Sequence, residues 1–184
     1  MKIHAATPND ATAIADIYAH FVAGSAITFE TEIPDAEEMR RRMGASQGLY
    51  PWFVAVDDQG VVHGYAYATL FKSRNAYRFS VETSIYVAPR SHGKGTGRLL
   101  YGQLLETLAR QGFVQAIASI TLPNPASLKL HQQLGFREVG LHRQIGFKSG
   151  EWHDVAQWQR PLAPIAVPPA EPRKAAEVFA LTTR

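Results

Sequence analysis

The sequence predicts an α/β fold in which helices flank a central, mixed and twisted sheet. The chain has 184 residues, which is the length of one compact domain. Hydrophobic residues make up 46% and charged residues 19%, which is the composition of a globular protein. Strand and helix patterns alternate in the second half of the chain, and this alternation predicts that some strands run parallel.

The N-terminal region predicts a strand over residues 1–5 followed by a helix. Thr7 is a typical N-cap, and Pro8 suits the first helical position. Apolar residues then recur at spacings of three and four, as in an amphipathic helix, until Gly24 ends it. The residues of this apolar face are Ile14, Ile17, Tyr18 and Phe21.

Turn residues divide the rest of the chain into strands and helices. Asp57–Gly60 predicts a hairpin turn, and Gly135 predicts the end of a helix. The further predicted elements are helices over residues 35–43 and 96–111, a helix that begins at Asn124 and ends at Gly135, and strands over residues 52–56, 61–71, 79–87, 115–121, 136–147 and 151–159.

Residues 161–184 differ in composition from the domain predicted over residues 1–160. They hold five of the eleven prolines. Proline fixes φ and removes a backbone donor, so regular structure is disfavoured there. We expect an extended, proline-rich C-terminal tail, or an arm that lies along a partner, with little structure of its own.

Composition and charge exclude several classes of function. The chain has no cysteine, which excludes a disulfide scaffold, thiolate metal sites and a cysteine nucleophile. Its seven histidines include no i,i+4 pair, so we expect no metal site. The net charge of +3 is too weak to indicate nucleic acid, and no apolar run suits a membrane span. Without a signal-peptide core near the N-terminus, we expect a soluble, cytoplasmic protein.

A basic, glycine-rich loop is the strongest functional signal. Gly93, Gly95 and Gly97 follow a strand and precede a helix, so backbone N–H groups can converge there on an anion. The positively charged residues of the loop are Arg90, Lys94 and Arg98. The spacing fits neither a Walker loop nor the dinucleotide fingerprint. The loop therefore predicts a phosphate-binding cradle of another kind.

The segment Arg90-Ser-His-Gly93-Lys-Gly95 resembles the acetyl-CoA loop of the GNAT superfamily of N-acetyltransferases. The helix from Asn124 to Gly135, followed by Phe136, is similar to a second element of that superfamily. Four separated segments further resemble the phosphinothricin and methionine sulfoximine N-acetyltransferase family, and the resemblance covers about residues 1–160. These segments are Arg74–Tyr77, Val81–Val87, Leu128–Gly135 and Gly146–Val155.

The resemblance implies the GNAT fold and transfer of an acetyl group from acetyl-CoA to the α-amino group of a small amino-acid-like acceptor. Phosphinothricin or methionine sulfoximine is the leading acceptor, although a herbicide-like compound can be an incidental substrate. The family implies direct attack in a ternary complex, so no covalent nucleophile is needed. It is typically homodimeric, so we expect a homodimer.

The resemblance also assigns a site for acetyl-CoA. A bulge in the strand before the glycine loop is expected to leave the N–H of Val87, or of a close neighbour, free to polarise the thioester carbonyl; an ordinary ladder amide is the alternative. Asn124 is expected to bond the pantetheine arm, to cap its helix, or both. The residues assigned to acetyl-CoA are Ile85, Tyr86, Val87, Arg90, Gly93, Lys94, Gly95, Thr96, Gly97, Arg98, Asn124 and Ser127.

Glu82 is the candidate general base. Strand alternation places it on one face with Ser84 and Tyr86, and a glutamate within an otherwise apolar strand is costly to bury without a purpose. The resemblance implies that Glu82 accepts a proton from the acceptor's amine, directly or through a water. The alternative is a partnered carboxylate on an exposed face of the sheet.

His131 stands where most members of the superfamily carry a tyrosine that acts as acid toward the thiolate. A histidine there can assist deprotonation or bond the substrate, or it can be a packed core residue. For the acceptor, a guanidinium suits a carboxylate or phosphinate, which favours Arg74. The residues assigned to the acceptor are Phe29, Lys72, Arg74, Tyr77, Glu82, Thr83 and Ser84. The alternative for Lys72 and Arg74 is that they are solvated loop charges, and the alternative for Tyr77 and Phe29 is that they are core aromatic residues.

Other functions remain open at the level of the sequence. An enzyme of the same fold could act on another small amine or on a protein N-terminus, and a non-enzymatic CoA-binding module is a further alternative. Gly44-Ala-Ser46-Gln-Gly48 spells a nucleophile elbow, but it follows a charged helix instead of a strand, which indicates a chance match. The run Arg40–Arg42 is interpreted as a solvated helix face, with a dimer contact as the alternative.

Overall fold

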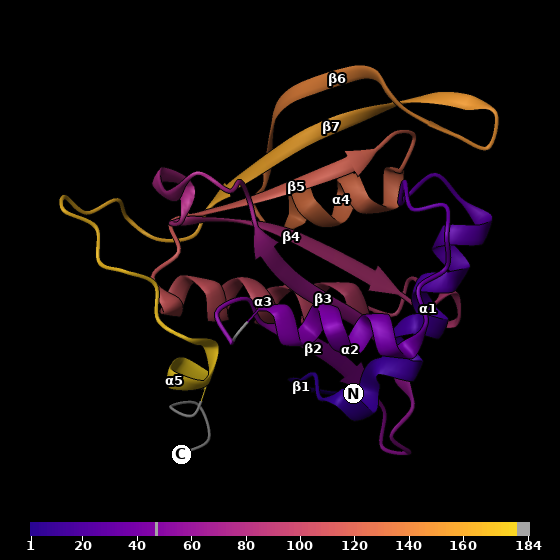
Figure 1. Cartoon of the computed structure of the whole chain (residues 1–184), viewed down its shortest axis with the longest axis horizontal. Helices are drawn as coiled ribbons and strands as arrows, with labels where there is room; N and C mark the ends of the chain where they lie inside the picture. Colours follow the sequence, from indigo (N-terminus) through magenta and orange to yellow (C-terminus); the bar gives the residue numbers. More distant parts are fainter. Residues whose placement is uncertain (47, 180–184) are drawn as a thin grey trace.

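The computed structural model describes residues 1–46 and 48–179. Its strands form one seven-stranded sheet in the order β1-β2-β3-β4-β5-β7-β6 (Figure 1). The strands are β1 (Lys2–Ala5), β2 (Trp52–Val56), β3 (Val62–Leu70), β4 (Ser80–Val87), β5 (Gln115–Thr121), β6 (Arg137–Lys148) and β7 (Glu151–Pro161). The α-helices are α1 (Ala11–Gly24), α2 (Ala36–Ala45), α3 (Thr96–Gln111), α4 (Pro125–Gln133) and α5 (Ala175–Phe179), and the short 3-10 helices are η1 (Pro8–Asp10), η2 (Asn75–Tyr77) and η3 (Pro89–Ser91).

A single parallel pair makes the sheet mixed. Neighbouring strands are antiparallel except β4 and β5. A parallel pair needs a crossover connection, and α3 supplies it between these two strands. The predicted class, helices around a mixed sheet, is therefore confirmed.

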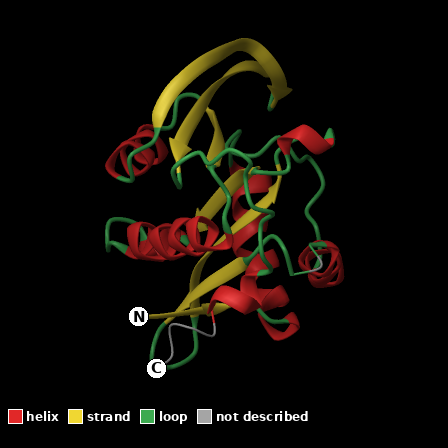
Figure 2. Cartoon of the chain, turned by 90° about the vertical axis from the view of Figure 1, so that its left-hand side faces the viewer, coloured by secondary structure: helices red, strands yellow, loops and turns green. Residues whose placement is uncertain are grey.

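Helices cover both faces of the sheet (Figure 2). On one face α3 buries Leu100, Leu104 and Leu108, which form a stripe at helical spacing. On the other face α1 buries Ile14 and Tyr18, and α2 packs beside it. Each face of the central strands thus has its own apolar core.

The helices begin at local capping signals. Thr7 donates its backbone N–H and its hydroxyl to the carboxylate of Asp10, at 2.7 and 2.8 Å. The predicted first helix therefore starts as the tight turn η1 before α1 continues it. Asp35 accepts the N–H of Glu38 at 2.8 Å and caps α2. The bounds of β2, α3 and β5 are those predicted from the sequence.

The β6–β7 hairpin extends beyond the rest of the sheet (Figure 1). Strand β6 is an edge strand, and nearly all of its residues are exposed. Lys148 is the exception, because its Nζ donates to the carbonyl oxygens of Val22 and Thr28, both at 2.8 Å. A cation at the carboxyl end of a helix is electrostatically favourable. Lys148 therefore ties the hairpin to the end of α1 and to the loop that follows it.

The described part of the predicted C-terminal tail is extended, with little regular structure before α5, and it packs against its own domain. Arg78 binds the carboxylate of Glu171 at 2.7 to 3.0 Å, and Gln111 Nε2 donates to the carbonyl of Arg173 at 2.7 Å. The short helix α5 then packs near α3. The prolines keep the segment extended, but contacts distant in sequence anchor it. Residues 180–184 of the predicted tail lie outside the described residues.

Candidate active site

The site is a wedge-shaped cleft between β4 and β5. The two strands pair only over Ser80–Glu82 and Gln115–Ile117. Beyond these residues they separate, as Figure 1 shows. The pocket between them is lined by residues of both strands, of α4 and of the loop after α1, namely Ile27, Thr83, Ser84, Ile85, Tyr86, Ala118, Ser119, Ile120, Thr121, Asn124, Ser127 and His131. A ligand in this cleft can reach the backbone edges of both strands.

The N–H of Val87 lies on the open edge of β4. Ala88 donates its N–H to the carbonyl of His63 at 2.9 Å, toward β3. Successive amides of a strand point to opposite edges, so the N–H of Val87 points away from β3. The register of β3 and β4 is continuous from Gly64–Val87 to Leu70–Val81, so the expected bulge is absent. The divergence of β5, and not a bulge, leaves this amide unpaired in the sheet.

The glycine loop leads into the N-terminus of α3. Gly93 and Gly95 have φ of +73° and +80°, a region that glycine adopts without strain. The first N–H groups of α3 have no intrahelical acceptor and favour an anion. Thr96 Oγ1 is buried without a hydrogen-bond partner in the described part of the chain. The free amides at this helix N-terminus fit a phosphate-bearing ligand, whereas the hydroxyl of Thr96 lies beneath them.

The basic side chains of the loop differ in availability. Lys94 and Arg98 are exposed and form no ion pair with any residue of 1–46 or 48–179. Arg90 donates its Nη2 to the carbonyl of Val62 at 2.6 Å. The guanidinium of Arg90 is thus partly engaged within the protein, whereas Lys94 and Arg98 can turn to a ligand.

Asn124 caps α4 at the edge of the cleft. Its side-chain oxygen accepts the N–H of Ser127 at 3.1 Å. The cap uses the oxygen, so the amide NH2 is the part of the side chain that can donate to a ligand. The capping role predicted for Asn124 is confirmed, and a contact with the pantetheine arm stays a prediction.

Glu82 lies on the face of β4 that packs against α1. This face is identified by Tyr86, whose ring centroid is 4.9 Å from that of Tyr18 on α1. Ser119 Oγ on β5 donates to Glu82 Oε1 at 2.7 Å, and Gln157 Nε2 on β7 donates to Ser119 Oγ at 3.0 Å. Glu82 is therefore partnered, but the contact uses only one carboxylate oxygen. The other oxygen can accept a proton.

His131 is a buried residue, 3% exposed, on the opposite side of β4. Its Nδ1 is 2.8 Å from the carbonyl of Ser127, and its Nε2 is 3.1 Å from the hydroxyl of Tyr101. Burial lowers the pKa of the imidazole. Both nitrogens are engaged within the protein, which supports the packed core histidine and not an acid.

Three of the residues assigned to the acceptor lie on the loop between β3 and β4. This loop joins the strands at the end of β4 where Glu82 lies. Lys72 Nζ lies 5.3 Å from the ring centroid of Phe71 and 5.8 Å from that of Tyr77. Arg74 is exposed at the start of η2. No contact joins this loop to Glu82 in the described structure, so their joint action stays a prediction.

Phe29 lies on the loop between α1 and α2 and is 38% exposed. Its ring packs on Gly146 of β6, where a Cβ atom would overlap it. The residue therefore belongs to the contact between this loop and the hairpin, close to Lys148. The predicted contact of Phe29 with the acceptor stays a prediction.

Thr83 and Ser84 point to opposite faces of β4. Thr83 is 3% exposed, and its hydroxyl bonds Tyr101 at 2.7 Å and the carbonyl of Ile117 at 3.1 Å. This placement in the core does not support the acceptor contact assigned to Thr83. Ser84 bonds Tyr67 on the face of Glu82, and burial raises the pKa of Tyr67.

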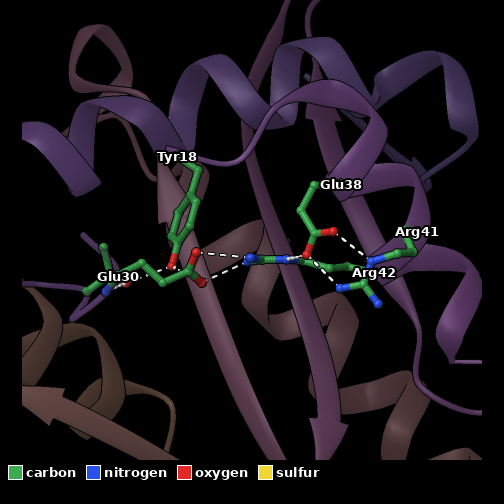
Figure 3. A network of polar contacts seen from close by, with 6 residues as sticks. Tyr18, Glu30, Glu38, Arg41 and Arg42 are labelled. Atoms are coloured by element: carbon green, nitrogen blue, oxygen red, sulfur yellow. Dashed lines mark hydrogen bonds and ion pairs between the residues drawn. The ribbon is translucent and has the colours of Figure 1, made fainter. Parts of the chain in front are cut away.

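A polar network on the face of Glu82 was not predicted from the sequence (Figure 3). Arg42 binds both carboxylate oxygens of Glu30 at 2.7 and 3.0 Å and that of Glu38 at 2.8 Å. Tyr18 donates to Glu30 at 2.9 Å, and burial raises its pKa to about 12. The interpretation of Arg40–Arg42 as a solvated face is therefore wrong for Arg42. The i,i+4 spacing of Glu38 and Arg42 could have indicated their contact from the sequence. The contact of Arg42 with Glu30 has no such local signal, because Glu30 lies on the loop before α2.

Ser119, which the sequence analysis also missed, carries no motif. Only the pairing of β5 beside β4 brings its hydroxyl to Glu82.

In the described part of the chain no cluster of three or more His, Cys, Asp or Glu side chains could bind a metal. None of the described helices combines the length and the apolar character that a membrane span requires.

Comparison with known proteins identifies the family. The sequence model of the acetyltransferase (GNAT) domain matches residues 3–156. The chain belongs to the GNAT family. The relatives include the phosphinothricin N-acetyltransferase of Streptomyces viridochromogenes, which is 39% identical over 97% of this chain and 96% of the relative. An L-methionine sulfoximine/L-methionine sulfone acetyltransferase of Salmonella typhimurium is 36% identical over 92% of this chain and 99% of the relative.

Solved structures show the same GNAT fold. A phosphinothricin acetyltransferase of Sinorhizobium meliloti, solved in complex with AcCoA, matches with a TM-score of 0.87 and 41% identity. That match covers 93% of this chain and 92% of the other. An acetyltransferase of Salmonella typhimurium with its cofactor acetyl-CoA also has a TM-score of 0.87, at 36% identity, and covers 92% of this chain and 98% of the other.

We predict that His131 makes the stability of the protein depend on pH. Burial lowers its pKa from the ordinary value of 6.5, so below pH 6.5 the unfolded chain binds more protons than the folded one. The free energy of unfolding therefore falls as the pH falls below about 6.5, by at most about 1.4 kcal/mol per pH unit for this group. Urea unfolding at pH 8 and pH 5.5 should show a larger loss for the wild type than for His131→Gln.

The control is His20→Gln, which changes an exposed histidine of α1 and should keep the wild-type pH dependence. Equal losses of stability in the wild type and in His131→Gln would show that His131 is not held neutral.

Proposed function

We propose that this protein transfers the acetyl group of acetyl-CoA to the α-amino group of a small amino-acid-like acceptor, with phosphinothricin or methionine sulfoximine as the leading acceptor. One observation carries the proposal. The open edge of β4 presents the N–H of Val87 between the glycine loop and Glu82, so one short strand can hold a thioester and a base. The names of the relatives support the acceptor class.

Acetyl-CoA would lie in the cleft with its diphosphate at the start of α3. The N–H groups after Gly95 would bind phosphate oxygens, and Lys94 and Arg98 would add charge. Asn124 would donate its amide NH2 to the pantetheine arm. The thioester oxygen would then accept the N–H of Val87, which is free because β5 has diverged.

Glu82 would remove a proton from the ammonium group of the acceptor. Its Oε1 is held by Ser119, so Oε2 is the oxygen that takes this proton. The neutral amine then attacks the carbonyl carbon, and the donor N–H of Val87 stabilises the charge that develops on the oxygen. The carbon–sulfur bond breaks, and sulfur leaves as a thiolate. The nitrogen of the new amide must lose a second proton, and the thiolate takes it, directly or through water, because a thiol with a pKa of about 8.5 is protonated near neutral pH. This transfer does not need His131, and Glu82 releases its own proton to solvent.

The acceptor would be held from the loop between β3 and β4. Arg74 is exposed there and can bind a carboxylate or phosphinate through two parallel N–H groups. Lys72 and Tyr77 lie together on the same loop and would bind the same anionic groups. These positive charges favour an amphoteric amino acid over a polyamine, because like charges repel.

The protein is also proposed to act as a homodimer that associates through the β6–β7 hairpin. An edge strand presents unpaired backbone groups, and an exposed apolar patch marks an interaction surface. The large apolar side chains exposed on this hairpin are Val139, Leu141, Ile145, Phe147 and Trp152. The two-fold pairing of two such strands would cover both features at once. The cytoplasmic location stays a prediction.

The first prediction of this proposal concerns the base. Glu82→Gln should lower kcat by about 10²- to 10⁴-fold and leave the affinity for acetyl-CoA intact, because an amide cannot accept the proton. Steady-state kinetics gives kcat, and calorimetry with acetyl-CoA gives the affinity. Ser119→Ala is the matched variant, since it keeps the carboxylate and should lose far less. Near-wild-type turnover in Glu82→Gln would remove Glu82 from this role.

The second prediction concerns the acceptor. Arg74→Ala should raise KM for phosphinothricin by about tenfold or more and raise KM for a neutral-side-chain amino acid less, because a bidentate charged contact is lost. A panel that also contains a polyamine and an N-terminal peptide, followed by thiol release, ranks the acceptors. An equal change in KM for charged and neutral acceptors would contradict the role of Arg74. Thiol release only with the peptide or the polyamine would select the alternative acceptor classes.

The third prediction concerns the dimer. The double variant Phe147→Asp and Trp152→Asp should sediment as a monomer, because charges within an apolar interface are desolvated without partners. Ile165→Asp is the control, since it changes an exposed apolar residue of the tail and should leave the dimer intact. A wild-type chain that sediments as a monomer at micromolar concentration would refute the homodimer without affecting acetyl transfer.

A further inference from the structure

A chain of hydrogen bonds links the β2–β3 turn to the start of the glycine loop. His63 Nε2 is 2.8 Å from Asp57 Oδ2, and His63 Nδ1 is 2.6 Å from Ser91 Oγ. Asp57 lies in the turn, His63 at the start of β3, and Ser91 at the end of η3. Ser91 lies 28 residues after His63, whereas Asp57 and His63 are six residues apart. None of the three takes part in the acetyl transfer described above.

The hydrogen-bonding pattern defines each role in this chain. Asp57 Oδ1 already accepts the N–H groups of Gln59 and Val61, both at 2.9 Å, so the turn holds the carboxylate in place. A carboxylate only accepts, so His63 Nε2 donates to Oδ2, and in the neutral ring Nδ1 accepts from the hydroxyl of Ser91. The bond from His63 also lowers the pKa of Asp57.

The arrangement has the residue types of a hydrolase triad, but Ser91 is only 1% exposed. A substrate cannot reach its oxygen, so nucleophilic chemistry is excluded by access. What the hydroxyl can do is hold the backbone of η3, which leads directly into Gly93 and Gly95.

Two further contacts join the same two segments. Ala88 donates its N–H to the carbonyl of His63 at 2.9 Å, and Arg90 Nη2 donates to the carbonyl of Val62 at 2.6 Å. Three of the four residues from Ala88 to Ser91 are therefore bonded to the start of β3. The segment before the glycine loop is therefore fixed. Gly93 and Gly95, at φ of +73° and +80°, lack a Cβ atom and can adopt other conformations.

We propose that Asp57, His63 and Ser91 are positioning residues that hold the glycine loop in the conformation that binds the diphosphate of acetyl-CoA. The inference rests on the proposed function, because that function names the ligand of the loop. A loop that is ordered before binding loses less conformational entropy on binding. If the loop reaches its competent conformation only part of the time, the apparent Kd rises by the inverse of that fraction.

The test combines hydrogen exchange without ligand with calorimetry using coenzyme A. In His63→Phe and Ser91→Ala, the amides of residues 92–98 should exchange faster than in the wild type. The Kd for coenzyme A should rise about fivefold, while kcat at saturating acetyl-CoA stays the same. The double variant should bind no more weakly than either single one, because both changes break one connection.

Two further variants separate positioning from general destabilisation. Asp57→Asn should keep wild-type affinity, because its NH2 group can donate to Nε2 while Nδ1–H donates to Ser91 in the other tautomer. His20→Phe changes an exposed histidine of α1 and should leave both exchange and affinity unchanged.

The two proposals fail in different ways. Unchanged exchange of residues 92–98 in both His63→Phe and Ser91→Ala overturns the positioning role, whatever the calorimetry shows. Absence of coenzyme A binding by the wild type overturns the proposed function and the ligand named here. Equal losses in Asp57→Asn and His63→Phe would also contradict the hydrogen-bonded chain.

Discussion

The site depends on the limited pairing of β4 with β5. Three residue pairs join the strands, and beyond Glu82 and Ile117 the backbone edges separate. A separated pair of strands exposes N–H and C=O groups that a regular sheet would satisfy internally. In this protein the exposed edge carries Val87 and leads into the glycine loop. A ligand that completes the interrupted ladder therefore meets both a backbone donor and a helix N-terminus.

Strand alternation divides the chemistry between the two faces of β4. Thr83 points into the core of α3, where Tyr101 and His131 form a closed set of buried hydrogen bonds. Glu82 points to the other face, where Ser119 orients its carboxylate. Buried polar groups that are fully bonded make a site rigid, whereas a group with a free lone pair can react. His131, with both nitrogens bonded, therefore stabilises the core beside the site, whereas Glu82, with one free oxygen, is the candidate base.

Contacts between distant segments hold the borders of the cleft. Lys148 joins the hairpin to the end of α1, and the Glu30–Arg42 pair joins the following loop to α2. On the far side, the tail reaches the β3–β4 loop through Glu171 and Arg78. Single exposed ion pairs contribute little stability. Their value here is geometric. The first two position the loop after α1, whose Ile27 lines the pocket, and the third anchors the tail to the β3–β4 loop.

The sequence by itself determined the α/β class, the bounds of β2, α3 and β5, and the glycine loop, because periodicity, turn residues and capping act over a few neighbouring positions. Only the tertiary structure decided that the amide of Val87 is freed by the divergence of β5, that Ser119 binds Glu82, and that the tail folds back. These features join residues tens of positions apart, and no local preference encodes which distant partner a side chain meets. Packing decides such contacts, because burial forces each polar group to find its partner wherever the fold brings one.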